Sequence, residues 1–86
     1  MPTISMFYGI MVQMFFNDHQ PAHFHVKYGD HKAIINVMTL EVMRGGLPRR
    51  ALAMVLEWAQ THRVELLVDW ELCRQMRMPH PIQPLE

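Results

Sequence analysis

The sequence predicts an α+β fold: a three- to four-stranded antiparallel meander, followed by one long kinked helix or two consecutive C-terminal helices packed on one sheet face. The apolar residues alternate with a period of two in the first half of the chain and recur at helical spacing in the second half. Only short turns separate the expected strands, which favours antiparallel pairing because parallel pairing needs long crossovers. The 86 residues suffice for one small domain with a single core.

Four segments in the first half are expected to form strands, namely residues 9–16, 22–28, 31–39 and, as a shorter one, 41–44. Turn residues at Asn17–Asp18 and Gly29–Asp30 separate them. In the first segment the residues expected to face the core are Ile10, Val12, Met14 and Phe16. In the second they are Phe24, Val26 and Tyr28. Because side chains alternate across a strand, His23, His25 and Lys27 are expected on the opposite, solvent-exposed face.

The second half is expected to be helical from Pro48 to about Met76, with proline at the first helical position. One helix of that length would measure about 43 Å at 1.5 Å per residue, so we expect a break near residues 61–63, although no Gly or Pro marks it. The three prolines of residues 79–86 end the helix and predict an extended C-terminal tail after a single domain of residues 1–78.

Composition excludes several classes of protein. No apolar run approaches the about 20 residues of a membrane helix, and the N-terminal stretch lacks the basic region of a secretory signal. Cys73 is the single cysteine, so no internal disulfide can form, which fits a cytoplasmic location. Because the formal net charge is zero, any anion site must come from local clustering of charge.

Three of the six histidines lie within the segment NDHQPAHFH, residues 17–25. His23 and His25 share one side of the expected strand, about 6.6 Å apart along the backbone, and His19 precedes them at the turn. Three imidazoles with an open position are a known arrangement for catalytic zinc, to which Asp18, His31 or a water could add a ligand. The alternative is that these are ordinary surface histidines.

A metal-free use of the same segment is the second hypothesis. His23 and His25 could act as a catalytic base and acid near neutral pH. Such chemistry needs an anion stabiliser, and Arg49 and Arg50, in the first turn of the expected helix, together with Lys27, are the candidate phosphate-binding residues. The alternative is that the two arginines pair internally, with Glu41, Glu57 or Asp69.

Taken together, these segments resemble a family of small bacterial proteins known as domain of unknown function 4160. The resemblance rests on ordered motifs along nearly the whole chain: MPTIS, FYGI, NDHQPAHFHV, TLEV, LPRRAL, EWA and the closing PIQPL. It implies a small intracellular bacterial protein of a kind associated by gene context with toxin–antitoxin-like pairs. Met6 and Ala22 depart from the family pattern, which commonly has an arginine and a second proline there.

Three functional hypotheses follow. In the first, the exposed histidines with Arg49 and Arg50 engage a phosphate-bearing ligand, RNA in preference, in a toxin-like effector that has a cognate antitoxin-type partner. In the second, the histidines form a divalent-metal site, for binding or for hydrolysis. In the third, the protein is a non-catalytic module that binds a partner through a sheet edge or through its proline-rich tail. Free strand edges also make a homodimer an expectation.

Overall fold

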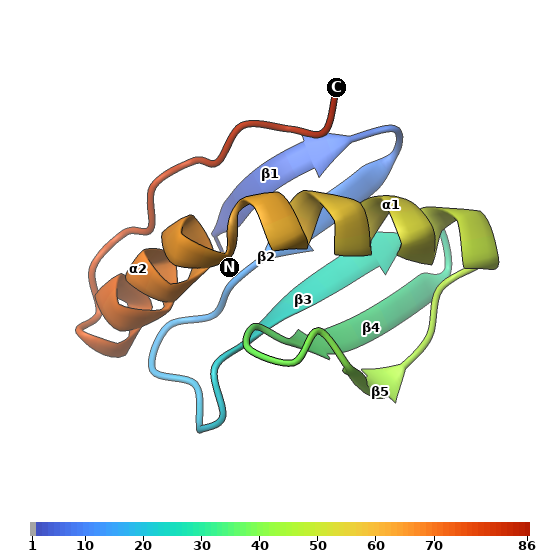
Figure 1. Ribbon diagram of the computed structural model, residues 1–86. Coiled ribbons are helices and arrows are strands. Elements are labelled where there is room, and N and C mark those ends of the chain that lie inside the picture. Colours follow the sequence, from blue (N-terminus) through green and yellow to red (C-terminus); the bar gives the residue numbers. More distant parts are fainter. Residues whose placement is uncertain (1) are drawn as a thin grey trace.

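The computed structural model describes residues 2–86 and has the expected α+β architecture, with five strands rather than three or four (Figure 1). All neighbouring strands pair antiparallel in a single meander of order β1-β2-β3-β4-β5. The strands are β1 (Thr3–Phe7), β2 (Ile10–Gln13), β3 (His23–Tyr28), β4 (His31–Asn36) and β5 (Val42–Gly45). The expected strands at 22–28, 31–39 and 41–44 are therefore confirmed to within a few residues at their ends.

The strand expected over residues 9–16 corresponds to the shorter β2, whereas β1 was not expected. A hairpin turn at Tyr8 and Gly9 joins the two strands. Both residues have positive φ, 50° at Tyr8 and 78° at Gly9, as a type I′ hairpin turn requires. The usual signal for such a turn is Asn or Asp before Gly, and here a tyrosine takes that position. For this reason the sequence did not reveal β1, although Ile10, Val12 and Met14 of the expected segment are fully buried as predicted.

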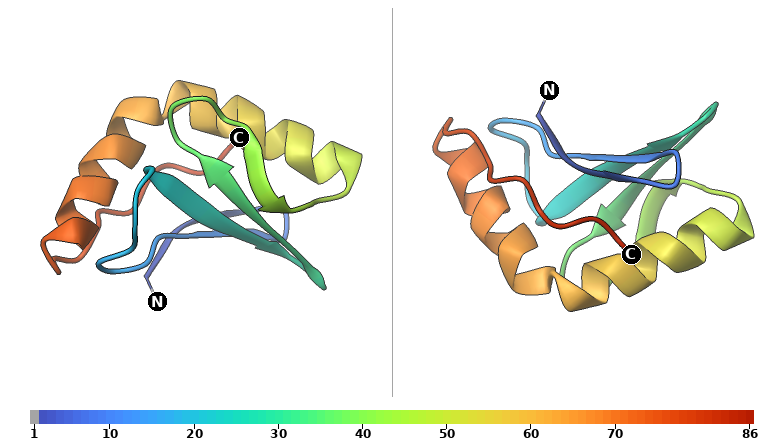
Figure 2. Two further views of the ribbon diagram at one scale, coloured as in Figure 1. Left: turned by 90° about the horizontal axis from the view of Figure 1, so that it is seen from below. Right: turned by 90° about the horizontal axis from the view of Figure 1, so that it is seen from above.

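The helical half divides at His62 into α1 (Arg49–Thr61) and α2 (Arg63–Arg74), which confirms the expected break. Helix α1 runs across one face of the sheet, whereas α2 turns away from it and passes around the end of the sheet where β3 begins (Figure 2). The other face of the sheet is left without a helix. None of the helices in the described residues is long and apolar enough to span a membrane.

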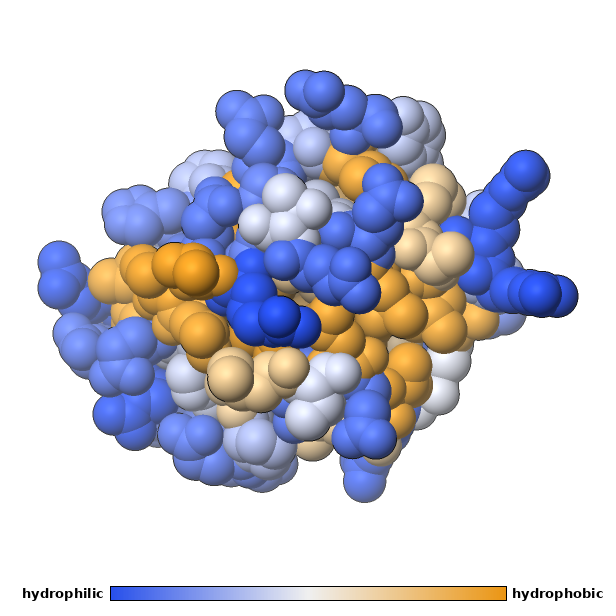
Figure 3. Space-filling view, viewed as in Figure 1, coloured by the Kyte–Doolittle hydropathy of each residue, from blue (hydrophilic) through white to orange (hydrophobic). Residues whose placement is uncertain are grey.

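A single core lies between the sheet and the helices, with Phe24, Ile35 and Trp58 among its largest buried side chains. The C-terminal segment belongs to this core rather than extending from it. Ile82 is 5 % exposed and its N–H donates to the Ile4 carbonyl at the outer edge of β1, while the Trp58 indole donates to the Gln83 carbonyl. On the helical side, apolar patches alternate with charged side chains (Figure 3). Val64 and Val68 of α2 are among its exposed apolar residues.

The register defines rows of side chains across the helix-free face. One row runs from β2 to β5 through residues paired in register: Gln13, His25, Ile34 and Arg44. The next row towards the β3–β4 turn pairs Met11 with Lys27 and Lys27 with Lys32. The histidine row therefore adjoins a row that carries both lysines of the chain.

Candidate metal centre

The loop between β2 and β3 brings an acidic residue back over the start of β3. Asn17 has a positive φ of 50°, and its N–H donates to the carbonyl of Cys73 near the end of α2 at 3.0 Å. This bond ties the loop to the second helix, and Asp18 follows directly. The carboxylate of Asp18 is thereby held beside the start of β3, which carries His23 and His25. Only 15 % of the Asp18 side chain is exposed.

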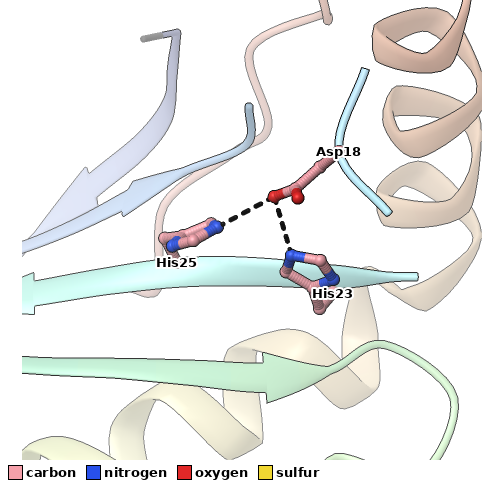
Figure 4. Close-up of side chains that lie close together, drawn as sticks. All are labelled: Asp18, His23 and His25. Atoms are coloured by element: carbon pink, nitrogen blue, oxygen red, sulfur yellow. Dashed lines mark hydrogen bonds and ion pairs between the residues drawn. The ribbon is translucent and has the colours of Figure 1, made fainter. Parts of the chain in front are cut away.

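Three potential ligand atoms converge at this point (Figure 4). The Oδ2 atom of Asp18 lies 2.8 Å from Nε2 of His23 and 3.3 Å from Nε2 of His25. Donor atoms of these three residues all lie within 4.8 Å of one another, and they form the one such group among residues 2–86. Two imidazoles and one carboxylate are a donor set that divalent transition metals favour.

His23 is held in a fixed orientation by its other ring nitrogen. Nδ1 lies 2.7 Å from the carbonyl oxygen of Pro21, which can only accept, so Nδ1 carries a hydrogen and donates it. In the neutral ring Nε2 then carries a lone pair, which points at the Asp18 carboxylate. Both atoms are acceptors, so they would repel each other without a positive group between them. Either a proton or a cation must therefore lie between His23 Nε2 and Asp18 Oδ2. A backbone carbonyl on the far nitrogen is also the usual support of a metal-binding histidine.

The sequence prediction that His23 faces solvent was wrong, because His23 is only 3 % exposed. The His23 side chain lies on the expected face of β3, but contacts with other parts of the chain cover it. The ring packs against Trp70 of α2 with a centroid separation of 5.0 Å, and Asp18 caps it from the loop. His25 is half-buried and Lys27 is exposed, so the side chains on this face become more exposed towards the end of β3.

His25 stacks on Phe15, with ring centroids 3.8 Å apart and planes 7° from parallel. Burial lowers the pKa of His25, and the charge of His23 lowers it further, against the opposing effect of Asp18. The neutral ring, which is the form that binds metals, is therefore favoured at neutral pH.

Asp18 is held in its ionised form. Burial by itself would raise the pKa of its carboxyl group. The backbone N–H of His19 and the rings of His23 and His25 donate hydrogen bonds to the carboxylate, and together with the charge of His23 they lower the pKa from 3.8 to about 2. The two histidines thus stabilise the negative charge of the Asp18 carboxylate that lies between them.

The third expected metal ligand, His19, is not part of the convergent group. Its ring is 90 % exposed, and Nδ1 donates to Oδ1 of Asp18, the oxygen that faces away from the other two rings. Asp18, considered from the sequence only as a further ligand, takes the third position instead. His31, the other suggested extra ligand, lies exposed at the far end of β4, opposite Tyr28.

The structure does not bring Arg49 and Arg50 to the histidines. Both are exposed in the first turn of α1, which begins at the end of the sheet where β3 ends, whereas His23 is the first residue of β3 (Figure 1). The internal partners considered for them are also absent, since no carboxylate of the described residues lies within 4.0 Å of either guanidinium. Phosphate binding at these arginines stays a prediction.

Arg44, a basic residue that the sequence did not single out, lies closer to the histidines than Arg49 and Arg50 do. Two adjoining hollows of about 420 and 300 Å³ open on the helix-free face, and both are lined by Phe15, His25 and Arg44. The first also contains Asp18 and His23, and the second contains Lys27 and Lys32. The sequence predicted a strand ending at Arg44. The pairing of Arg44 with Ile34 places Arg44 in the row of His25, and this pairing depends on strand register, which the sequence does not give.

Comparison with known proteins places the chain in a family. A family model described as "Domain of unknown function (DUF4160)" matches residues 9–71. The chain belongs to this family. The matched region includes all three members of the candidate centre and Arg44, and the resemblance noted from the motifs is thereby confirmed. No curated protein and no solved structure matches the chain.

Proposed function

We propose that this protein binds a divalent transition-metal ion, such as Zn²⁺, through Asp18, His23 and His25. The observation that carries the proposal is the convergence of Asp18 Oδ2 and the two Nε2 atoms, with His23 held on the Pro21 carbonyl. A backbone acceptor on the far nitrogen is the support that metal-binding histidines usually have.

The two separations that involve Asp18 fit an ion after a small adjustment. Ligand atoms about 2.0 to 2.1 Å from a tetrahedral zinc ion lie about 3.3 Å from one another. The Asp18–His25 separation of 3.3 Å already has this value, and the Asp18–His23 separation of 2.8 Å would need to open slightly. The ion would replace the hydrogens that now lie between these atoms, so binding should release protons.

Three protein ligands leave at least one coordination position open. The candidate centre borders the hollow of about 420 Å³ that contains Phe15 and Arg44, so the open position can face that space. A metal ion in such a site lowers the pKa of a bound water and polarises phosphoryl or carbonyl oxygens. Metal-dependent hydrolysis is therefore the chemistry that this arrangement suits.

Elemental analysis of protein purified without an affinity tag tests the proposal, followed by titration of the chelator-treated protein with Zn²⁺, Fe²⁺, Mn²⁺ and Ni²⁺. We expect one ion per chain. Replacing Asp18 by Asn or His25 by Ala should weaken binding by more than about 100-fold, since loss of a ligand costs more than loss of a supporting group. Asp30→Asn and His31→Ala change the same residue types at exposed positions outside the centre and should bind as the wild type.

Absence of stoichiometric metal in the purified and the refilled protein would overturn the proposal, as would unchanged affinity in Asp18→Asn. Circular dichroism of each variant shows whether the fold is kept. His25, which is only half-buried, is the safer position if a substitution of buried His23 fails to fold.

A metal-free function of the same group is the second candidate, and the Asp18–His23 distance of 2.8 Å favours it, because this is a hydrogen-bond length. In that case the imidazoles exchange protons with a phosphate-bearing ligand, RNA in preference. Induction of wild type, His23→Ala and Arg49→Ala in cells, with growth and RNA integrity as readouts, tests this effector role. Equal growth and intact RNA in all three would count against it, while metal content separates it from the first candidate.

The toxin–antitoxin, partner-module and homodimer hypotheses stay predictions. The structure changes how one of them should be tested. Because Ile82 is buried against the fold, deleting the tail after Met78 would expose the core and would not report on partner binding alone. Substitution of exposed Gln83 or Pro84 by Ala, followed by pull-down of a neighbour, is the cleaner test.

A further inference from the structure

Positive charge gathers on the helix-free face directly beside the candidate metal centre. The hollow of about 300 Å³ next to His25 is lined by Lys27, Lys32 and Arg44 and by no acidic residue. No carboxylate of residues 2–86 lies within 4.0 Å of any of the three cationic groups. In a chain whose formal net charge is zero, this concentration of unpaired cations is local.

The register adds an independent observation. Lys27 and Lys32 are directly opposite each other on β3 and β4, with their side chains on the same face. Like charges in directly opposed positions destabilise a pair of strands. An anion held between the two ammonium groups would remove this repulsion, and Arg44 on β5 completes the rim on the side towards the metal centre.

The floor of this hollow is apolar. Phe15 and Ile34 line it, and Phe15 lies flat against the ring of His25. Cations around an aromatic and aliphatic floor suit a ligand that combines phosphate with a flat, weakly polar ring. His25 and Arg44 line both hollows, so a ligand seated here would extend to the open side of the centre.

We propose that the hollow formed by Phe15, Lys27, Lys32, Ile34 and Arg44 binds a nucleotide, free or as a unit of single-stranded RNA, with its phosphate among the three cationic side chains. This inference deepens the proposed function, because it names the ligand class of the metal centre. On this proposal Lys27, Lys32 and Arg44, rather than Arg49 and Arg50, bind the phosphate beside the histidines.

The test measures binding of adenosine 5′-monophosphate and of a short fluorescent single-stranded RNA to the chelator-treated and the Zn²⁺-loaded protein. We expect both ligands to bind the loaded protein, and Arg44→Gln and the double variant Lys27→Gln/Lys32→Gln to weaken binding at least about tenfold, the loss of one charge-assisted contact. Arg74→Gln and Arg77→Gln remove the same charge at exposed positions elsewhere on the surface and should leave affinity unchanged.

Two outcomes would overturn the inference. One is no binding of either ligand to the loaded and the metal-free protein, and the other is equal weakening by Arg77→Gln and Arg44→Gln, which would show non-specific attraction. Metal stoichiometry measured on the same samples keeps the two proposals apart, because Arg44→Gln should retain a full equivalent of metal. Tighter binding of the RNA, with a steeper dependence on salt, identifies a strand as the source of the nucleotide. Equal affinity for the two ligands identifies the free nucleotide.

Discussion

Two aspartates, Asp18 in the β2–β3 loop and Asp69 in α2, have surroundings that shift their pKa values in opposite directions. Asp18 is surrounded by donors, which hold its pKa at about 2. Asp69, which is 1 % exposed, accepts one hydrogen bond, from the N–H of His80 at 2.8 Å, and its Oδ2 has no partner among the described residues. Burial raises the pKa of Asp69, and the nearby charge of Glu65 adds to the effect, against the His80 contacts.

The difference separates a candidate site from a structural contact. A carboxylate kept ionised between two imidazoles can bind a cation, whereas a buried carboxyl group with a raised pKa can hold a segment of chain in place. In this protein the segment is the C-terminal tail, whose backbone bonds to Asp69. The comparison yields four predictions.

The largest effect is expected at Ile82, which is next but one to His80 and is buried in the core. Ile82→Ala removes a branched side chain from the contact between the tail and β1, and should lower the free energy of unfolding by about 2–5 kcal/mol. Chemical denaturation measures the change. Metal stoichiometry should be the same as in the wild type, and loss of metal in this variant would show that the two regions are not separate.

A smaller loss is expected from Asp18→Asn in the metal-free protein. The amide cannot accept charge-assisted hydrogen bonds from both rings, and the free energy of unfolding should fall by about 1.5–3 kcal/mol, the range for bonds to a charged group. The exposed Asp30→Asn is the matched control and should leave the unfolding midpoint in place. A midpoint in Asp18→Asn equal to that of the control would contradict the assigned hydrogen bonds.

The pH dependence of stability should separate the two carboxyl groups by sign. The pKa of Asp18 is lowered on folding, so its contribution is present above the unfolded value of 3.8 and is lost as pH falls towards about 2. The pKa of Asp69 is raised, so its contribution is present below 3.8 and is lost as pH rises through the folded value. Thermal unfolding of metal-free protein across this range, compared with Asp18→Asn and Asp69→Asn, should show each trend disappear in one variant only.

The smallest effect is expected for Asp69→Asn above pH 7. The amide oxygen can still accept from His80, and the variant removes a buried negative charge, so stability should change by less than about 1 kcal/mol. Metal binding should be unaffected. A loss as large as that of Asp18→Asn would mean that Oδ2 of Asp69 has a partner in solution, for example a buried water.

Much of the fold could be predicted from local pattern. The alternation of Ile10, Val12 and Met14 identified their buried face. The excessive length of one helix indicated a break near residues 61–63, where the structure has it. The pattern failed at β1, since Tyr8 with positive φ gives no turn signal. For the candidate site, the sequence drew attention to residues 17–25 and to the shared face of His23 and His25.

Periodicity within one strand therefore determined which side chains point together, because alternation is a local property of the backbone. It could not determine what covers them. The turn of α2 that places Trp70 on His23, the Asn17–Cys73 bond that positions Asp18, and the register that aligns Arg44 with His25 join residues far apart in the sequence. Only the tertiary structure decided these contacts, since register and docking are set by the packing of the whole core.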